Sequence, residues 1–235
     1  MDAIRRYEPN IDYNKYFFDV LSSYANKNLE VLDLGTGKDA KVISKGSLLK
    51  LCKYVAGIDI NSDTIKNLQT KYKNFGNVKF TMADSTKKTS LSSASFGVIT
   101  ALFSPFSLKE VKRLLKPNGT FIAMFALPGD HSELRQVLPE LFETKTWVTL
   151  AATNGKDLFA VFENSELKEK EIYPVFNLGF KYKWFFPNTT EVQKFYSHIL
   201  DRDVPISQLK KLKQINKEIP ITRKIGLVVL KKLPY

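Results

Sequence analysis

The feature that most constrains the fold is an apolar run that ends in a glycine turn and is followed by more apolar runs of similar length. Residues 29–34 read Leu-Glu-Val-Leu-Asp-Leu and lead into Gly35-Thr36-Gly37. Further apolar runs, which we interpret as buried strands, follow at residues 54–60, 77–82, 96–103 and 120–125. Segments with helical spacing lie between them, at residues 40–51, 64–72 and 108–115. Strands that alternate with helices predict an α/β fold with a parallel sheet.

The rest of the chain is less regular, but 235 residues fit one domain. We therefore expect a single domain, residues 1–235, in which residues 129–220 are an elaboration that contributes a substrate cap. Outside the regular part we expect helices at residues 11–24, 131–141 and 191–200, and strands at residues 146–151, 158–163 and 225–230.

The composition excludes several classes of protein. One cysteine and two histidines offer no disulfide pair and too few ligands for a cysteine-rich zinc site, so we expect no metal and a reducing compartment. No apolar run reaches the roughly 18 residues that a membrane span needs, and the first six residues lack the apolar core of a signal peptide. We therefore expect a soluble, cytoplasmic protein with no membrane contact.

The charge of the chain is concentrated at one end. The chain has 36 basic and 24 acidic residues, and residues 205–235 alone hold eight basic residues against one acid. A basic C-terminal segment of this kind favours binding to a polyanion such as RNA. The alternative is an ordinary solvated surface that is rich in lysine.

Acidic residues stand near the ends of three predicted strands. Asp33 precedes the glycine turn, Asp59 follows the second strand's apolar core, and Asp84 comes after the third strand. Because the carboxyl ends of parallel strands meet at one edge of a sheet, these carboxylates converge where such folds bind ligands. An acid about 20 residues past the glycines is placed to accept hydrogen bonds from a ribose. The pattern therefore predicts a nucleotide-like ligand.

These motifs resemble those of the class I S-adenosylmethionine-dependent methyltransferases. Residues 29–127 match the family's acid-x-Gly-x-Gly turn, its acids after the second and third strands, and its turn before the fifth strand, here Lys116-Pro117-Asn118-Gly119. The resemblance implies a Rossmann-like fold with a mostly parallel seven-stranded sheet, an antiparallel last strand, and S-adenosylmethionine as cofactor. The cofactor-binding residues that it implies are Asp33, Gly35, Gly37, Asp59, Ile60, Asp84, Ser85 and Leu102.

The glycine turn leaves one competing interpretation. The methyltransferase family often has a third glycine where this chain has Asp39. A dinucleotide-dependent oxidoreductase would place its third glycine at Ala40, a permitted substitute. The turn before the fifth strand and Asp84 favour the methyltransferase.

The loop after the fourth strand lies where the methyltransferase family places its acceptor. The implied substrate-binding residues are Phe103, Ser104, Pro105 and Phe106. The two phenylalanines either sandwich a flat base or belong to the core. Methyl transfer is an in-line displacement that requires alignment more than dedicated acid–base groups, so no catalytic residue is predicted.

The acceptor itself is predicted from a second likeness. Residues 103–106, 110–119 and 128–134 are similar to the bacterial large-subunit ribosomal RNA guanine-N1 methyltransferases, whose zinc module this chain lacks. We therefore expect an RNA base as acceptor and RNA as partner. The alternatives are a small-molecule acceptor and a non-catalytic, methyltransferase-like binding protein.

Two features of the second half of the chain have ordinary structural interpretations. We expect both histidines, His131 and His198, to be solvated surface residues. The aromatic cluster that contains Trp184, flanked by Lys181 and Lys183, is either a single-stranded nucleic-acid platform or, as we prefer, a strand with one buried face.

Overall fold

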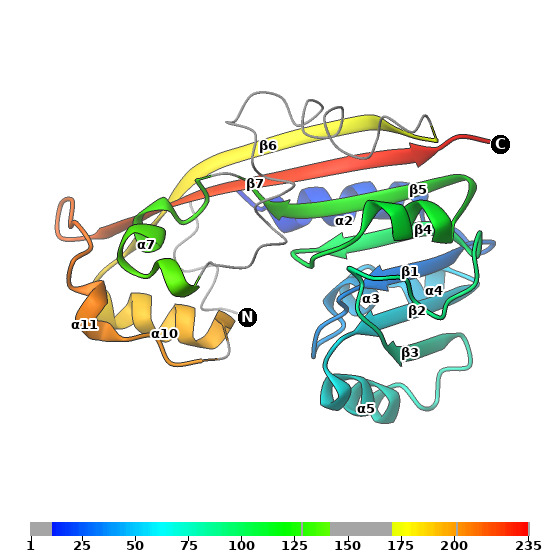
Figure 1. The fold of residues 1–235 in the computed structure, drawn as a ribbon, viewed down its shortest axis with the longest axis horizontal. Coiled ribbons are helices and arrows are strands. Elements are labelled where there is room, and N and C mark those ends of the chain that lie inside the picture. The colour runs from blue at the N-terminus through cyan, green and yellow to red at the C-terminus, as the bar shows by residue number, and fades with distance from the viewer. Residues whose placement is uncertain (1–10, 128, 142–170, 201, 235) are drawn as a thin grey trace. The chain divides into compact units, whose positions relative to one another are not determined.

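The computed structural model describes residues 11–127, 129–141, 171–200 and 202–234 (Figure 1). The strands that we expected at residues 146–151 and 158–163 lie outside the described residues. The described strands are β1 (Glu30–Leu34), β2 (Tyr54–Asp59), β3 (Val78–Met82), β4 (Phe96–Leu102), β5 (Leu115–Ala126), β6 (Ile172–Phe186) and β7 (Ile219–Lys232). The described helices are α2 (Tyr13–Tyr24), α3 (Lys41–Lys45), α4 (Leu48–Leu51), α5 (Ser62–Lys71), α6 (Leu108–Leu114), α7 (Ser132–Val137), the 3-10 helix η1 (Pro139–Leu141), α10 (Thr189–Leu200) and α11 (Ile206–Leu209).

All seven described strands form one sheet, in the order β3-β2-β1-β4-β5-β7-β6. The pairings of β1 with β2 and β4, of β2 with β3, and of β4 with β5 are parallel. The arrowhead of β7 lies at the opposite end from that of β5, its neighbour (Figure 1). The sheet is therefore mixed, and the expectation of a mostly parallel sheet is corrected: the long strands β6 and β7 make a larger antiparallel part than the apolar run at 225–230 indicated.

The strands of the first half are apolar because they lie in the interior of the molecule. Val31, Leu32, Val55, Ile58 and Ile99 have no exposed surface. Strands that are covered on both faces read as continuous apolar runs rather than as alternating ones. The sequence prediction of an α/β fold is confirmed, and the ends of β1, β2 and β4 agree with the predicted ones within about one or two residues.

The helix that we expected at residues 40–51 is two short helices. Gly46 and Ser47 separate α3 from α4, and Ser47 has a left-handed φ of 52°. By contrast, α5 begins where its capping chemistry predicts, because the Asn61 side chain accepts hydrogen bonds from the backbone N–H groups of Asp63 and Thr64. The α3 segment therefore ends after five residues and leaves the glycine turn followed by a short, compact element.

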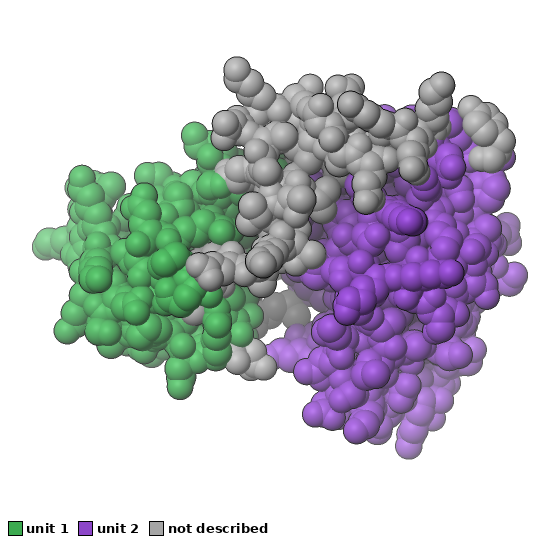
Figure 2. Space-filling view, in the orientation of Figure 1, with its two compact units in different colours: residues 1–13, 126–152, 179–225 green, residues 14–125, 153–178, 226–235 purple. Residues whose placement is uncertain are grey.

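The described chain divides into two compact units (Figure 2). Unit 2 comprises residues 14–125, 153–178 and 226–235, and it contains β1 to β4 and most of β5. Unit 1 comprises residues 1–13, 126–152 and 179–225. It contains most of the described part of the elaboration predicted at residues 129–220. β6 and β7 each contribute residues to both units.

Unit 1 is built around aromatic side chains. Along the second half of β6, the side chains alternate: Tyr182, Trp184 and Phe186 are buried, whereas Lys181, Lys183 and Phe185 are exposed. The Trp184 ring lies edge-on to Phe195 of α10, with ring centroids 5.0 Å apart. The preferred interpretation of this cluster, a strand with one buried face, is confirmed.

A buried ion pair lies against this aromatic core. Asp130 is fully buried, and its Oδ1 accepts a hydrogen bond of 3.0 Å from Nε of Arg223. The Arg223 guanidinium lies over the Trp184 ring, 3.8 Å from its centroid. Nδ1 of His131 lies 2.9 Å from Oδ2 of Asp130, and 14% of the His131 side chain is exposed. The expectation that His131 is a solvated surface residue is therefore wrong, because the aspartate and the aromatic rings enclose it; His198 is exposed as expected.

Candidate functional site

The glycine turn after β1 requires glycine at two positions. Gly35 has φ +63° and Gly37 has φ +65°, in the left-handed region that other residues rarely adopt. A Cβ at Gly35 would lie 1.8 Å from Oγ of Ser104, which follows β4. A Cβ at Gly37 would meet no atom within 4 Å. Gly35 therefore allows close approach of the loop after β4, while Gly37 faces open space.

Asp33, two residues before the turn, is a buried carboxyl group that forms no ion pair within the part of the chain that the structure describes. It lies opposite Thr100 in the register of β1 and β4, and its Oδ1 accepts a hydrogen bond of 2.8 Å from the Thr100 hydroxyl. Its Oδ2 has no hydrogen-bond donor among the described residues. Burial raises the pKa of Asp33 to about 7; the hydroxyl groups of Thr100 and Thr36 oppose this rise, and the nearby Asp59 carboxylate adds to it. A buried carboxyl group that lines a cavity, with an oxygen that has no donor among the described residues, indicates a site for a positively charged or hydrogen-bond-donating ligand.

Asp59, the last residue of β2, connects the ends of two strands. Its Oδ2 accepts a hydrogen bond of 2.9 Å from the Gly37 backbone N–H. Its Oδ1 accepts one of 2.9 Å from the Asn61 backbone N–H. Each carboxylate oxygen can accept a second hydrogen bond, so Asp59 can fix the glycine turn and still bind a ligand hydroxyl.

Asp84 and Ser85 follow β3 and organise the adjoining loop. Hydrogen bonds from the Thr86 side chain and backbone N–H, at 2.6 and 2.9 Å, lower the pKa of Asp84, and Lys87 adds to this effect. The Ser85 hydroxyl donates a hydrogen bond of 2.7 Å to the Pro105 carbonyl oxygen. The loops after β3 and β4 are therefore joined beside the glycine turn.

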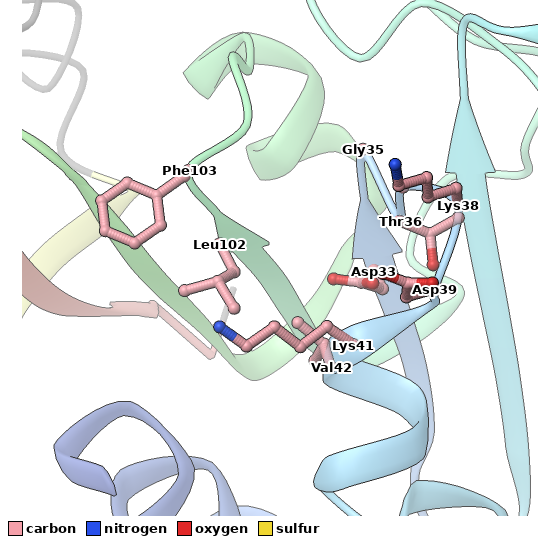
Figure 3. Close-up of a pocket in the computed structure, with 10 residues that line it drawn as sticks. Asp33, Gly35, Thr36, Lys38, Asp39, Lys41, Val42, Leu102 and Phe103 are labelled. Atoms are coloured by element: carbon pink, nitrogen blue, oxygen red, sulfur yellow. The ribbon is translucent and has the colours of Figure 1, made fainter. Parts of the chain in front are cut away.

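Two adjacent cavities open at this edge of the sheet, and Gly35 and Phe103 line both of them. The first has a volume of about 260 Å³ and the second of about 280 Å³. The first is lined by Asp33, Gly35, Thr36, Gly37, Lys38, Asp39, Lys41, Val42, Leu102 and Phe103 (Figure 3). The second is lined by Gly35, Asp59, Ile60, Asp84, Ser85, Phe103, Ser104 and Pro105.

The structure brings almost all of the sequence-predicted site residues to these cavities. Phe106 is the exception: it is buried and packs against Phe121, with ring centroids 4.8 Å apart. The expectation that Phe106 binds substrate is therefore corrected, because its ring is part of the core. Phe103 has a left-handed φ of 52° and is only partly buried, so it remains at the cavity wall.

Sequence reasoning discussed Asp39 at the glycine turn but missed four other residues that line the first cavity: Thr36, Lys38, Lys41 and Val42. A signal for two of them was present. In a helix that begins just after the glycine turn, the first residues lie beside the turn, which places Lys41 and Val42 at the wall of the first cavity. The expectation of one long helix from residue 40 gave no reason to single out Lys41.

The geometry fits an elongated ligand with an amino-acid-like end and a nucleoside-like end. The first cavity offers the unpartnered Asp33 oxygen, and the second offers the Asp59 carboxylate beside Ile60, whose side chain is 70% exposed. A left-handed glycine turn after the first strand, acids at the ends of the next two strands, and the sheet order with β7 between β5 and β6 together define a Rossmann-like, class I methyltransferase fold.

The comparison with protein families agrees with this class. The family described as "Methyltransferase domain" matches residues 25–179, so the chain belongs to that family and is an S-adenosylmethionine-dependent methyltransferase. A search of curated proteins found no match.

Solved structures share the fold at low sequence identity. The YcgJ protein from Bacillus subtilis is 14% identical, with a TM-score of 0.60 over 93% of this chain and 99% of that one. The [4+2]-cyclase SpnF is 13% identical, with a TM-score of 0.59 over 97% of this chain and 86% of that one. A geranyl diphosphate methyltransferase in complex with SAM is 10% identical, with a TM-score of 0.57 over 93% of this chain and 84% of that one. At these identities the likeness establishes the fold, whereas the family match carries the assignment.

No helix within the described residues is long and apolar enough to cross a membrane.

Proposed function

We propose that S-adenosylmethionine binds across the two cavities, with its methionine end beside Asp33 and its adenosine beside Asp59 and Asp84. The observation that carries this orientation is the Asp33 Oδ2 atom, which is buried and has no donor among the described residues. The α-ammonium group of the methionine end would supply that donor, and its charge would favour ionisation of Asp33. A glycine turn lets the ligand approach the backbone closely.

The second cavity suits the adenosine half. Asp59 is only partly buried, and a ribose diol would donate hydrogen bonds to its carboxylate. Ile60 presents an exposed apolar side chain that an adenine ring would cover, with the Asp84 and Ser85 loop beside it. When bound, the sulfonium supplies a methyl group that its positive charge makes electrophilic. The protein holds the reactants in line, and Phe103 and Pro105 limit the access of water to them.

We infer that the acceptor is an RNA base and that unit 1 contributes to RNA binding. The supporting observation is a run of exposed lysines in unit 1: Lys210, Lys211, Lys213 and Lys217. Lys181 and Lys183 add exposed basic side chains along β6 in the same unit. Lysines that contact phosphates release counterions, which gives binding that weakens steeply with salt.

The test is transfer of tritiated methyl groups from S-adenosylmethionine to total RNA from cells that lack the gene. Reversing the charge at Lys210, Lys211 and Lys213 to glutamate should lower incorporation by about tenfold or more at physiological salt. The affinity for S-adenosylhomocysteine should stay unchanged. A matched triple reversal at Lys50, Lys66 and Lys73, which are exposed in unit 2, is the control and should have little effect. Equal incorporation by both triple variants would contradict an RNA-binding role of the lysines.

A small molecule is the second candidate acceptor, and the position of Phe103 favours it. Its partly buried ring lines both cavities and offers an apolar surface to a small ligand. The likeness to a geranyl diphosphate methyltransferase is consistent with such an acceptor. Label that appears only in the small-molecule fraction of a cell extract, independent of salt and of the lysine reversal, would select this candidate over RNA.

A further inference from the structure

The first cavity carries opposite charges on two of its sides. The Asp33 carboxyl group comes from β1, and the Lys41 side chain comes from the first residue of α3. Figure 3 shows the Lys41 side chain extended so that its Nζ lies toward Leu102, while the Lys38 side chain points elsewhere. An acid on one side and an ammonium group on another complement a zwitterion, which is the form of an α-amino acid at neutral pH.

The Lys41 side chain is held in this position from a second element. Its Nζ donates a hydrogen bond of 2.8 Å to Oδ1 of Asn14, which lies in α2. Both residues belong to unit 2, as does every residue that lines the cavity. An ammonium group has three N–H donors, so the bond to Asn14 is compatible with a ligand oxygen on the same nitrogen. The contact with α2 orients a side chain that would otherwise have many rotamers, and this lowers the entropy cost of binding.

We propose that Lys41, positioned by Asn14, binds the α-carboxylate of the amino-acid end of the ligand while Asp33 faces its ammonium group. This proposal rests on the proposed function, because it requires the methionine end to lie in the first cavity. It assigns Lys41 the recognition of one functional group. Lys41 therefore distinguishes nucleosides that carry a complete amino acid from those that do not.

The experiment compares three ligands of the full-length protein by calorimetry. S-adenosylhomocysteine carries the whole amino-acid end, its decarboxylated analogue lacks only the carboxylate, and methylthioadenosine lacks both charged groups. Lys41→Met keeps most of the side-chain volume and removes the charge. It should weaken S-adenosylhomocysteine binding by about ten- to a hundredfold, the usual effect of a lost charge-assisted hydrogen bond, and change the other two affinities by less than about twofold.

Three further variants separate recognition from structural damage. Lys41→Arg should keep most of the preference for the carboxylate, because it keeps a cation there. Asn14→Ala should lose part of the preference for S-adenosylhomocysteine over its decarboxylated analogue, because Lys41 is then less well oriented. Lys45→Met, at the exposed end of the same short helix, is the matched control and should bind all three ligands as the unaltered protein does.

A failure of the proposal about Lys41 can be distinguished from a failure of the proposed S-adenosylmethionine site. If Lys41→Met weakens the binding of all three ligands equally, Lys41 supports the structure of the cavity and does not bind the carboxylate. The proposal is then overturned. The same conclusion follows if the unaltered protein prefers S-adenosylhomocysteine to the decarboxylated analogue and Lys41→Met keeps that preference. If the unaltered protein binds none of the three nucleosides, the donor site of the proposed function fails and the inference about Lys41 fails with it.

Discussion

The two compact units each bury an aspartate, and they do so in opposite ways. Asp33 of unit 2 has a hydroxyl partner and, among the described residues, no cation in an ion pair, and burial raises its pKa to about 7. Asp130 of unit 1 is buried as completely, but the charges of His131 and Arg223 outweigh the effect of burial and hold its pKa below the usual value. Burial and the charge of Arg223 lower the pKa of His131 in turn.

The difference separates a binding site from a structural cluster. The Asp130 carboxylate is engaged by Arg223, by His131 and by the Lys224 backbone N–H, and the aromatic rings of unit 1 pack around it. The Asp33 carboxylate forms no ion pair with a cation among the described residues, its partner is the Thr100 hydroxyl, and it lines a cavity. A buried carboxylate that is paired with cations stabilises one conformation, whereas a buried carboxylate without a cation can bind a ligand that brings a positive charge.

The largest effect should come from breaking the buried pair of unit 1. Arg223→Met leaves Asp130 buried without the Arg223 guanidinium, and we expect it to lower the free energy of unfolding by about 3–5 kcal/mol. Urea unfolding followed by circular dichroism measures this change. Lys194→Met, which breaks the exposed Lys194–Glu191 pair, is the control and should change stability by less than about 0.5 kcal/mol. Equal effects of the two variants would show that the buried pair is not what stabilises unit 1.

The next effect compares the two glycines of the turn in unit 2. Gly35→Ala combines a left-handed φ with a collision against Ser104, and we expect it to cost about 2–4 kcal/mol of stability. Gly37→Ala brings the same backbone strain into open space and should cost only about 1 kcal/mol. Thermal unfolding of both variants measures the difference. If the two cost the same, the approach of Ser104 to Gly35 does not constrain the turn.

The smallest effect is a pH dependence that belongs to Asp33. Its pKa is about 7 in the folded protein and near 3.8 when exposed. Between about pH 4 and pH 7, Asp33 is therefore protonated in the folded state and ionised in the unfolded state. The stability that the protonated form contributes is present below about pH 4 and is lost as the pH rises toward 7. Relative to the unaltered protein, Asp33→Asn should therefore gain about 2 kcal/mol of stability between pH 5 and pH 8. Urea unfolding at both pH values tests this, and a difference between the two proteins that does not change with pH would mean that Asp33 ionises normally.

Much of the fold and of the site could be predicted because the signals are local. The apolar run before Gly35 marks a buried strand, and the spacing from Gly37 to Asp59 reflects one strand–helix–strand unit. Asn61 marks the start of α5 through its capping hydrogen bonds. The errors arise where the outcome depends on a distant partner. The sequence left open whether Phe106 binds a ligand or belongs to the core, and its contact with Phe121 places it in the core. The sequence predicted a solvated His131, but Asp130 and the aromatic rings of unit 1 enclose its side chain.

The sequence alone determined that this chain forms an α/β fold with a glycine turn and acids at neighbouring strand ends, because strand periodicity, turn residues and their spacing are local properties of the sequence, and the resemblance of these motifs to a family indicated a methyltransferase. Only the tertiary structure decided that Asp33 has no cationic partner among the described residues, while Asp130 is paired with Arg223 and His131. It also decided that Lys41 is held by Asn14, from α2, at the wall of the cavity. These properties depend on burial and on partners up to 94 residues apart in the chain, and local sequence carries no information about either.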